Sequence, residues 1–284
     1  FKGSMTPSPA VSNFNTSGTA QGGDFEPLYA IMYVAPINNK WAFGVSISQP
    51  YSLSLDYGSG GVTRYASTTE NFYMMNFGPS LSYKPTKSLS FGLGFDVAYA
   101  AMRFDKMNFS GTTSNDSKRK LYSNDWGYGY HLGMLWKASS KTVLGLSYRS
   151  RMAINFRGND RVTGPLGYTR TRFKSDLTLP PVALLSLQQQ LADRWALLGS
   201  VAFTQYSDMD KWVLQDRASS EHIDVVKKLN DSWRYALATK FTLNPVLNVT
   251  AGVAYTTSGL ADSDRFATFP MSSQTTLGFG VNYR

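Results

Sequence analysis

The last ten residues of the chain, 275–284, read TTLGFGVNYR. Every second residue is apolar or aromatic, namely Leu277, Phe279, Val281 and Tyr283, and the residues between them are small or polar. Side chains of a β-strand point alternately to its two faces, so this segment is predicted to form a strand with one apolar face. A soluble sheet buries such a face in a core. A transmembrane β-barrel turns it toward lipid and lines its lumen with the small, polar face.

The same alternation recurs along the chain. It is clear in the segments 89–99, 126–136, 144–157, 233–241 and 249–255, and fainter in 27–36, 41–56, 70–84, 172–191 and 194–207. Together these segments predict about eleven strands. Most of them are longer than the roughly five or six residues usual in soluble sheets and match the 9 to 11 residues or so that span a bilayer.

The connections between these segments differ in length. Short turns are predicted at 37–40, 85–87, 138–141, 192–193 and 244–245, and longer loops at 57–69, 105–121, 158–171, 208–230 and 258–270. Short turns at one end and long loops at the other are typical of outer-membrane barrels, with the short turns in the periplasm. The sequence therefore predicts one all-β domain over 1–284, an antiparallel transmembrane β-barrel that crosses a bacterial outer membrane many times. A soluble β-sandwich would explain the alternation, but not Trp126 and Trp136 at both ends of one long apolar face.

Composition supports a barrel and excludes several other classes. Aromatic residues make up 14% of the 284 residues and there are 24 glycines, which suits a barrel with aromatic girdles. Without cysteine the chain has no disulfide, cysteine-ligated zinc or cysteine nucleophile. The net charge is +9, yet the basic residues form no dense run beyond 118–120 and 227–228, so a basic rim facing lipopolysaccharide, or a basic lumen, is preferred to nucleic-acid binding.

Several short sequences occur in an order and spacing shared with one family. They are SQPY at 48–51, NFGPSLSYK at 76–84, LSFGLG at 89–94, GLSYRS at 145–150, LPP at 179–181 and DSWRYAL at 231–237. In this order they resemble the FadL-type transporters of long-chain fatty acids and other hydrophobic compounds. The resemblance implies a barrel of about fourteen strands with an N-terminal hatch. It also implies that this chain begins after the hatch and the first strand and ends before the last two strands. The hatch's Asn-Pro-Ala signature is absent from the chain, so no hatch function is carried over.

Pro50 interrupts an otherwise regular strand. The candidate kink consists of Ser48, Gln49, Pro50 and Tyr51. Proline has no N–H to donate and is confined to the edges and bulges of sheets. One interpretation is a β-bulge without a function. The other follows from the resemblance, because the corresponding strand of the family is kinked: the wall opens here and an apolar ligand leaves sideways into the bilayer. Such a ligand keeps a gain of roughly 0.8 kcal/mol for each CH₂ that stays out of water.

Several basic residues alternate with outward apolar positions and are therefore predicted to face the lumen. They are Arg149, Arg151, Arg157, Arg234 and Lys240. A guanidinium offers two parallel donors to a carboxylate, so Arg149, Arg151 and Arg234 are candidates for binding an acidic substrate. The resemblance adds Lys106, which lies near a head-group-binding basic residue of the family.

Two alternatives to substrate binding and transport remain open. The lumen arginines would instead pair internally with Asp96 and Asp125, or the barrel would be an adhesin or phage receptor that binds through the polar loops 105–121 and 208–230. An enzyme is not expected. His131 and the only other histidine, His222, have no second ligand at metal spacing, and no Gly-x-Ser-x-Gly occurs.

The predicted function is passive transport of fatty acids or other hydrophobic compounds, such as aromatic hydrocarbons, with no catalytic residue, metal or cofactor. We expect a monomer surrounded by outer-membrane lipid and lipopolysaccharide.

Overall fold

The computed structural model describes residues 2–4, 17–23, 27–209, 212–217, 222–226, 228–261 and 267–283. Strands β1 (Lys2–Ser4) and β2 (Ser17–Thr19) form a separate small sheet. The other strands form one sheet of 16: β3 (Ala30–Pro36), β4 (Trp41–Ser48), β5 (Ser52–Asp56), β6 (Thr69–Tyr83), β7 (Leu89–Ser110), β8 (Thr112–Lys137), β9 (Thr142–Arg149), β10 (Met152–Gly164), β11 (Gly167–Leu179), β12 (Val182–Ala192), β13 (Trp195–Thr204), β14 (Trp212–Asp216), β15 (His222–Val226), β16 (Ser232–Asn244), β17 (Leu247–Thr256) and β18 (Gln274–Tyr283).

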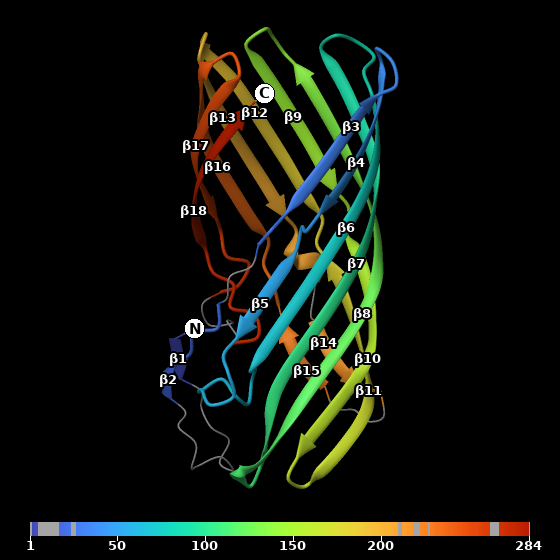
Figure 1. The fold of residues 1–284 in the computed structure, drawn as a ribbon, viewed down its shortest axis with the longest axis vertical. Helices are drawn as coiled ribbons and strands as arrows, with labels where there is room; N and C mark the ends of the chain where they lie inside the picture. Colours follow the sequence, from blue (N-terminus) through green and yellow to red (C-terminus); the bar gives the residue numbers. More distant parts are fainter. Residues whose placement is uncertain are drawn as a thin grey trace.

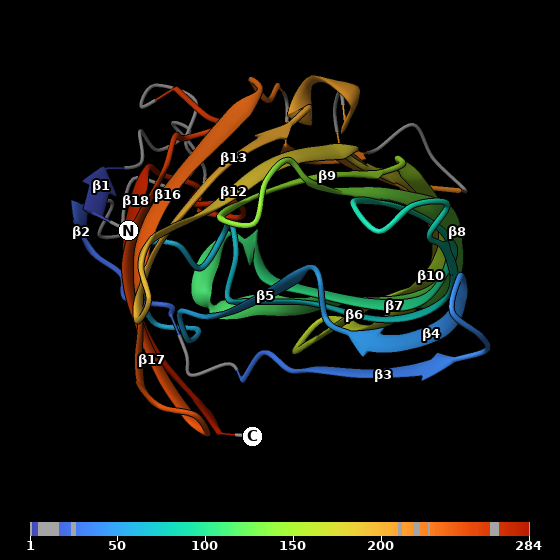
Figure 2. The same cartoon turned by 90° about the horizontal axis from the view of Figure 1, so that it is seen from above.

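The large sheet is a curved, antiparallel wall. Seen from above, its strands curl around a central space (Figure 2). Short turns join β3 to β4, β6 to β7, β8 to β9, β12 to β13 and β16 to β17 at one end, here called the short-turn end (Figure 1). The hairpins β7–β8 and β10–β11 reach the opposite end, here called the hairpin end. The predicted all-β antiparallel architecture is confirmed, although within the described residues no pairing joins β3 to β18 to close the wall.

Helix is scarce in the described part of the chain. A single 3₁₀ turn, η2 (Tyr206–Met209), follows β13. No helix among the described residues is long and apolar enough to cross a membrane.

Two predicted loops are strands. Residues 105–121 belong to the β7–β8 hairpin, where Lys106 pairs with Arg119, and residues 158–171 belong to the β10–β11 hairpin. Gly111 and Gly167 turn the two hairpins with φ of 89° and 131°, values that favour glycine. The loop prediction is wrong because polar side chains suit a strand equally well where its outer face meets water. The segment 208–230 likewise contains β14 and β15.

Three of the predicted long strands are each broken in the middle. Residues 41–56 divide into β4 and β5, 144–157 lies across β9 and β10, and 172–191 divides into β11 and β12. The described sheet has 16 strands instead of the eleven or so expected from the alternation, because these breaks add three strands and the segment 208–230 adds β14 and β15.

The inward face of the chain inverts at each break. Even-numbered residues such as Ser46 face inward in β4, whereas odd-numbered residues such as Leu53 face inward in β5. The cause is a β-bulge: Ser48 pairs with Asn76 and Ser52 pairs with Tyr73, so β4 and β5 together carry one more residue than β6 over this stretch. The pairings of β9 and β10 with β8 show one extra residue in the same way.

The inversion corrects the prediction for residues 151–157. Ile154 and Phe156 have no exposed surface and lie inside, although the alternation of 144–157 places them outside. Arg151 and Arg157 are consequently exposed on the outer face, where the Arg157 guanidinium lies 2.9 Å from the carboxylate of Asp176. The prediction that Arg151 and Arg157 face the lumen is wrong, because the extra residue near Ser150 inverts the strand.

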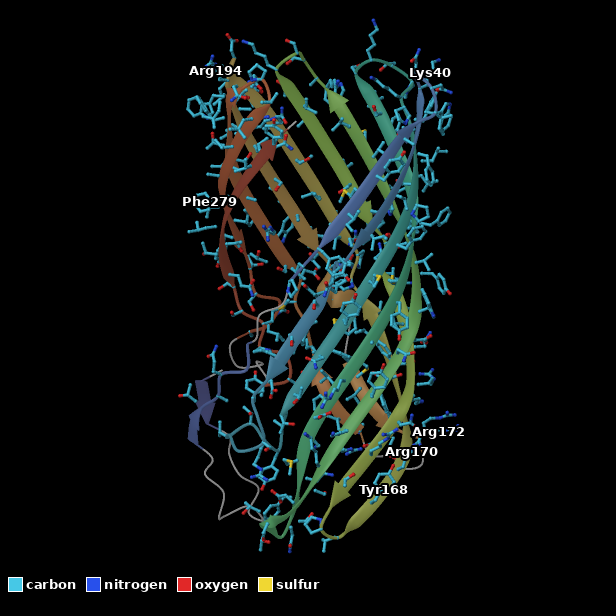
Figure 3. All side chains as sticks on the ribbon, viewed as in Figure 1. Lys40, Tyr168, Arg170, Arg172, Arg194 and Phe279 are labelled. Atoms are coloured by element: carbon cyan, nitrogen blue, oxygen red, sulfur yellow. The ribbon has the colours of Figure 1, made fainter. Side chains whose placement is uncertain are left out.

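On β8 the predicted alternation holds and defines an outer apolar band. Tyr128, Tyr130 and Leu132 are exposed between Trp126 and Trp136. Ten residues cover about 34 Å along a strand, or about 25 Å along the axis at the usual tilt, which matches the apolar band of an outer-membrane barrel. The same outward pattern ends in β18, where Phe279 points away from the wall (Figure 3).

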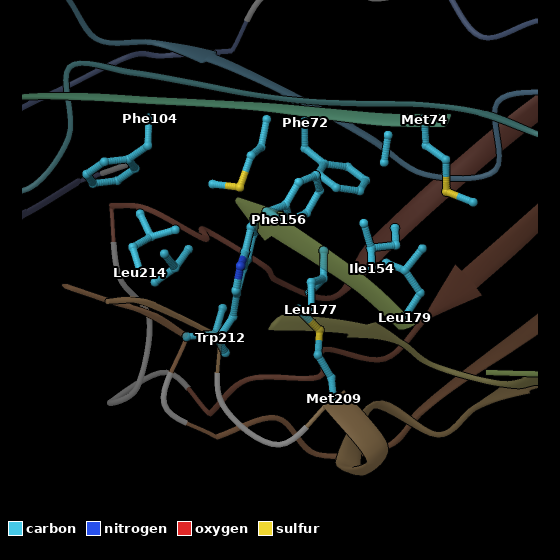
Figure 4. Packing of buried hydrophobic residues seen from close by; sticks show 14 of the residues in the cluster. Phe72, Met74, Phe104, Ile154, Phe156, Leu177, Leu179, Met209, Trp212 and Leu214 are labelled. Carbon is cyan, nitrogen blue, oxygen red and sulfur yellow. The ribbon is translucent and has the colours of Figure 1, made fainter. Parts of the chain in front are cut away.

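The hairpin end is filled by a hydrophobic core. Phe72, Met74 and Phe104 from β6 and β7 face Ile154 and Phe156 of β10 across the interior (Figure 4). The phenyl ring of Phe72 packs edge-on against the rings of Phe156 and Trp212, with centroids 6.5 and 6.2 Å away. The remaining members come from β7, β8, β10, β11, η2, β14, β15 and the connections around them, and include Leu121, Phe173, Leu177, Leu179, Met209 and Leu214.

Candidate functional site

A polar cluster lies inside the wall at the level of the breaks. The carboxylate of Asp96, on β7, accepts a hydrogen bond of 2.6 Å from the amide of Asn76, on β6. Its other oxygen lies 3.1 Å from Nδ1 of His131 and 4.0 Å from Nε of Arg149. Asp96, His131 and Arg149 line a cavity of about 540 Å³ that extends into the short-turn half. Its other lining residues are mostly small, polar or aliphatic, including Ser46, Ser80, Gly92 and Leu184.

Two glycines allow the imidazole of His131 to lie against the wall. A Cβ atom on Gly94 would lie 2.2 Å from Nε2 of His131 and 2.7 Å from the carbonyl oxygen of Pro79. A Cβ on Gly78 would approach the Ser46 hydroxyl to 2.7 Å. The imidazole therefore occupies the space that side chains would fill at these positions, and this close approach fixes it beside Asp96.

The four basic residues predicted to bind substrate do not form one site. Arg149 borders the cavity of about 540 Å³, and Arg234 lies in β16 on the inward-facing side, between the outward Trp233 and Tyr235. Arg151 is on the outer face. Lys106 lies in the hairpin half, where it pairs with Arg119. It is twelve residues along β7 from Gly94, the residue that pairs with His131. Twelve residues of strand span about 40 Å.

The predicted internal pairing is present in part. Asp96 carries the contacts to His131 and Arg149 described above, whereas the carboxylate of Asp125 accepts a 2.8 Å hydrogen bond from the N–H of Trp126. Asp125 is therefore engaged with the backbone of its own strand.

The break at Pro50 is a β-bulge that adjoins an apolar cavity. The N–H of Gln49 still donates to the carbonyl of Tyr29 at 3.3 Å, and pairing with β6 resumes at Ser52. A cavity of about 360 Å³ lies on the inner side of Pro50, between Tyr51, Leu53, Phe72, Leu177, Leu179, Pro180, Tyr206, Met209, Trp212 and Met271. The hydroxyl of Tyr51 donates to the carbonyl of Pro180 at 3.2 Å, and so links the break between β4 and β5 to the break between β11 and β12.

A further discontinuity lies between β8 and β10, and side chains seal it. β8 pairs with β9 through residues 131–137 and with β10 through residues 118–122. In between, the N–H of Ser150 donates to the carbonyl of Tyr130 at 2.9 Å, and no further ladder pairs form between the described residues of these strands. Met152 and Ile154 fill this stretch from inside, since a Cβ on Gly127 would meet their side chains at 2.7 and 3.0 Å. The N–H of Tyr130 donates to the hydroxyl of Ser150 at 2.9 Å. The unpaired edge is thus protected from lipid by packing and by a side-chain hydrogen bond.

The loop 57–68 is fixed to the tip of the β7–β8 hairpin. The guanidinium of Arg64 and the hydroxyl of Tyr65 both reach the same oxygen of Asp116, each at 2.7 Å. Lost hydration, together with the hydrogen bond to Asp116, raises the pKa of Tyr65 to about 12, so the phenol remains a donor at neutral pH. The predicted loop at 57–69 is thus a packed cover over the hairpin end.

Sequence reasoning did not anticipate the apolar cavity or the bridge from Tyr51 to Pro180. Two signals in the sequence mark the breaks in the strands, and the second of them lies at the bridge. Three polar residues in succession, Arg149, Ser150 and Arg151, interrupt the alternation where β9 gives way to β10, and the pair Pro180-Pro181 interrupts it between β11 and β12.

Comparisons with known proteins agree on one family. The family described as outer membrane protein transport protein (OMPP1/FadL/TodX) matches residues 4–284. A long-chain fatty acid transport protein of Salmonella typhi is 25% identical over 89% of this chain and 65% of its own length. Outer membrane protein P1 of Haemophilus influenzae is 24% identical over 89% of this chain and 62% of its own length. The chain thus spans somewhat less than two thirds of the length of these relatives.

Solved structures show the same fold. The crystal structure of a Pseudomonas aeruginosa FadL homologue superposes with a TM-score of 0.83 at 18% identity and covers 96% of this chain and 70% of that one. The Pseudomonas putida toluene transporter TodX gives a TM-score of 0.71 at 17% identity, over 90% and 73% of the two chains. The resemblance noted in the sequence is confirmed, and with it the outer-membrane location. The chain belongs to the FadL/TodX family of outer-membrane transport proteins.

Proposed function

We propose that the chain carries out passive transport of hydrophobic compounds across the outer membrane, with lateral exit near Pro50. The observation that carries this proposal is the apolar cavity of about 360 Å³ beside the bulge. Its size lies in the range of roughly 300 to 1,000 Å³ typical of ligand sites, and its lining is mainly apolar. A ligand that moves from this cavity into the bilayer never exposes its apolar surface to water.

Fatty acids and aromatic hydrocarbons are both candidate substrates. Relatives are named as a long-chain fatty acid transport protein and a toluene transporter, and both compounds suit an apolar cavity. Arg149 provides a cation close to this level, so we propose it as the partner of a substrate carboxylate, with Lys106 and Arg234 as contacts at other points of the path. Arg151 has no part in this path because it lies outside the wall.

The lateral route is tested by removing the bulge. Deleting Gln49 together with Pro50→Val leaves Ser48 opposite Asn76 and Ser52 opposite Tyr73, and gives β4–β5 as many residues as β6 between these pairs. We expect the variant to fold with a continuous wall and to lose most uptake of a labelled long-chain fatty acid in cells that express the protein.

The matched control is Pro79→Val, which changes a proline in the neighbouring strand where pairing with β7 keeps its register. This control should transport at the original rate. If the bulge deletion folds, as judged by heat-modifiable gel migration and circular dichroism, and still transports at the original rate, the lateral route is wrong. Substrate would then leave at the short-turn end.

A further inference from the structure

A patch of basic side chains covers the outer face of β8, β10 and β11 in the hairpin half. It consists of Lys120, Arg157, Arg161, Arg170, Arg172 and Lys174, and is called the basic face below. Arg170 and Arg172 are seen near the hairpin end in Figure 3. The proposed transport path runs inside the wall and uses none of these residues.

Three of these cations stand directly opposite one another on adjacent strands. Arg161 pairs in register with Lys120 on one side and with Arg170 on the other. Directly opposed residues of antiparallel strands have Cβ atoms about 5 Å apart, and like charges in this arrangement destabilise the sheet. Lys174 and Arg157 form a second opposed pair beside this row. The arrangement costs stability unless an anion lies over it.

The described residues supply few anions to this face. Asp176 pairs with Arg157. Asp105 of β7 stands opposite Lys120, but its buried carboxylate lies 2.7 Å from Arg103 and 3.7 Å from Lys118. The guanidinium of Arg170 is held in place by the neutral amide oxygen of Asn159, at 2.9 and 3.1 Å. Within the described part of the chain, Lys120, Arg161 and Arg172 have no acidic side chain within 4.0 Å.

The basic face lies just beyond the outer apolar band. Lys120 follows the same outward side of β8 as Trp126, six residues farther toward the hairpin end. Six residues correspond to about 20 Å of strand and about 15 Å along the axis. A group bound there lies outside the acyl chains but within reach of a saccharide head group attached to them.

We propose that the basic face binds the phosphorylated saccharide head group of lipopolysaccharide in the outer leaflet around the protein. Phosphate groups match guanidinium donors in charge and geometry, and a head group with several phosphates would span the row of opposed cations. The proposal rests on the orientation in which the hairpin end faces outward. It adds a lipid site on the outer wall to the proposed transport path.

The test measures lipid binding directly and does not depend on uptake. The purified chain in nonionic detergent is titrated with lipopolysaccharide and with the same lipopolysaccharide after enzymatic removal of its phosphates, and bound lipid is followed by native mass spectrometry. The variant K120Q/R161Q/R170Q removes the row. Its affinity for the phosphorylated form should fall about tenfold or more, since charge-assisted contacts are lost. The dephosphorylated form should bind weakly to both proteins.

The matched control is K137Q/K141Q/R194Q, which removes the same charge from exposed positions toward the short-turn end. It should bind like the original chain. Because the row repels itself, K120Q/R161Q/R170Q should unfold at the same or a higher temperature than the original chain in lipid-free detergent, which shows that it is folded. Equal losses in both variants, or equal binding of the dephosphorylated form, would overturn the proposal. Unchanged lipid binding with slower fatty-acid uptake would overturn it too, in favour of substrate capture.

Discussion

The interiors of the two halves of the wall are lined by different kinds of residue. In the short-turn half the interior is lined by small and polar residues around Asp96 and His131, while Leu132 and its neighbours on the outer face are apolar. In the hairpin half the interior holds Phe72, Ile154 and Phe156, and the outer face carries arginines and lysines. One half is built as a membrane barrel and the other as a soluble sheet, because one is surrounded by lipid and the other by water.

The same strands serve both halves in two different ways. β6, β7 and β8 run through both without inversion, and their inward residues change from small or polar to apolar along the strand, as from Gly94 to Phe104 on β7. In β4–β5, β9–β10 and β11–β12 the inward-facing side of the chain changes at a break instead. A break is therefore the means by which one alternating sequence presents its apolar residues to lipid on one side and to a core on the other.

The largest expected effect removes core packing from the hairpin half. Phe156→Ala deletes a side chain with no exposed surface and should lower the free energy of unfolding by about 3 to 5 kcal/mol. Leu184→Ala changes a partly exposed residue that lines the cavity of about 540 Å³ in the other half, and should cost less than about 1.5 kcal/mol. Urea unfolding of both variants from lipid vesicles measures the difference. Equal losses would mean that the two interiors are packed alike.

The free-energy cost of a charge on the outer face should differ between the two halves, because one faces lipid and the other faces water. Leu132→Arg places a cation near the centre of the outer band and should cost about 2 to 4 kcal/mol of folding free energy in lipid vesicles. Tyr122→Arg changes an exposed residue on the same side of the same strand, beyond Trp126, and should cost about 0 to 1 kcal/mol. The same unfolding assay applies. Similar costs at the two positions would place both in the same medium and remove the distinction.

The smallest effect concerns the boundary between the halves. Gly94→Ala forces a Cβ against His131 and the Pro79 carbonyl and should cost about 1 to 3 kcal/mol, with a shifted imidazole NMR signal. Gly92→Ala is the matched control, because a Cβ there would meet nothing within 4 Å. It should leave both the unfolding free energy and the His131 signal unchanged. An unmoved signal in Gly94→Ala would show that His131 does not depend on the glycine.

The sequence predicts the short-turn half well and the hairpin half poorly. Alternation on β8 correctly places Trp126 and Trp136 on one outer apolar face, because lipid on one side of the wall and the lumen on the other impose one pattern over the whole height of the bilayer. It misassigns Arg151 and Phe156, because a single extra residue reverses every following side chain and alternation alone does not locate a bulge.

The candidate site was predictable only in its parts. Pro50 predicts the break between β4 and β5, since proline lacks the N–H that a regular ladder of hydrogen bonds needs. That the inner side of Pro50 meets Tyr206, Met209 and Trp212 depends on how the connection after β13 folds back into the barrel. Such contacts between segments distant in sequence leave no periodic signal. Arg149 and Lys106 looked equivalent by charge, but the length of the β7–β8 hairpin separates them.

The hydrogen bond from Tyr51 to Pro180 ties two weak points of the wall to each other. Regular strand pairing is interrupted at both points. The bond connects the β4–β5 break directly to the β11–β12 break. A hydrogen bond of this kind contributes only about 0.5 to 1.5 kcal/mol to stability. While the bond is formed, the distance between Tyr51 and Pro180 is fixed. A ligand that inserts beside Tyr51 and displaces this hydroxyl would loosen both sides of the barrel in a single step.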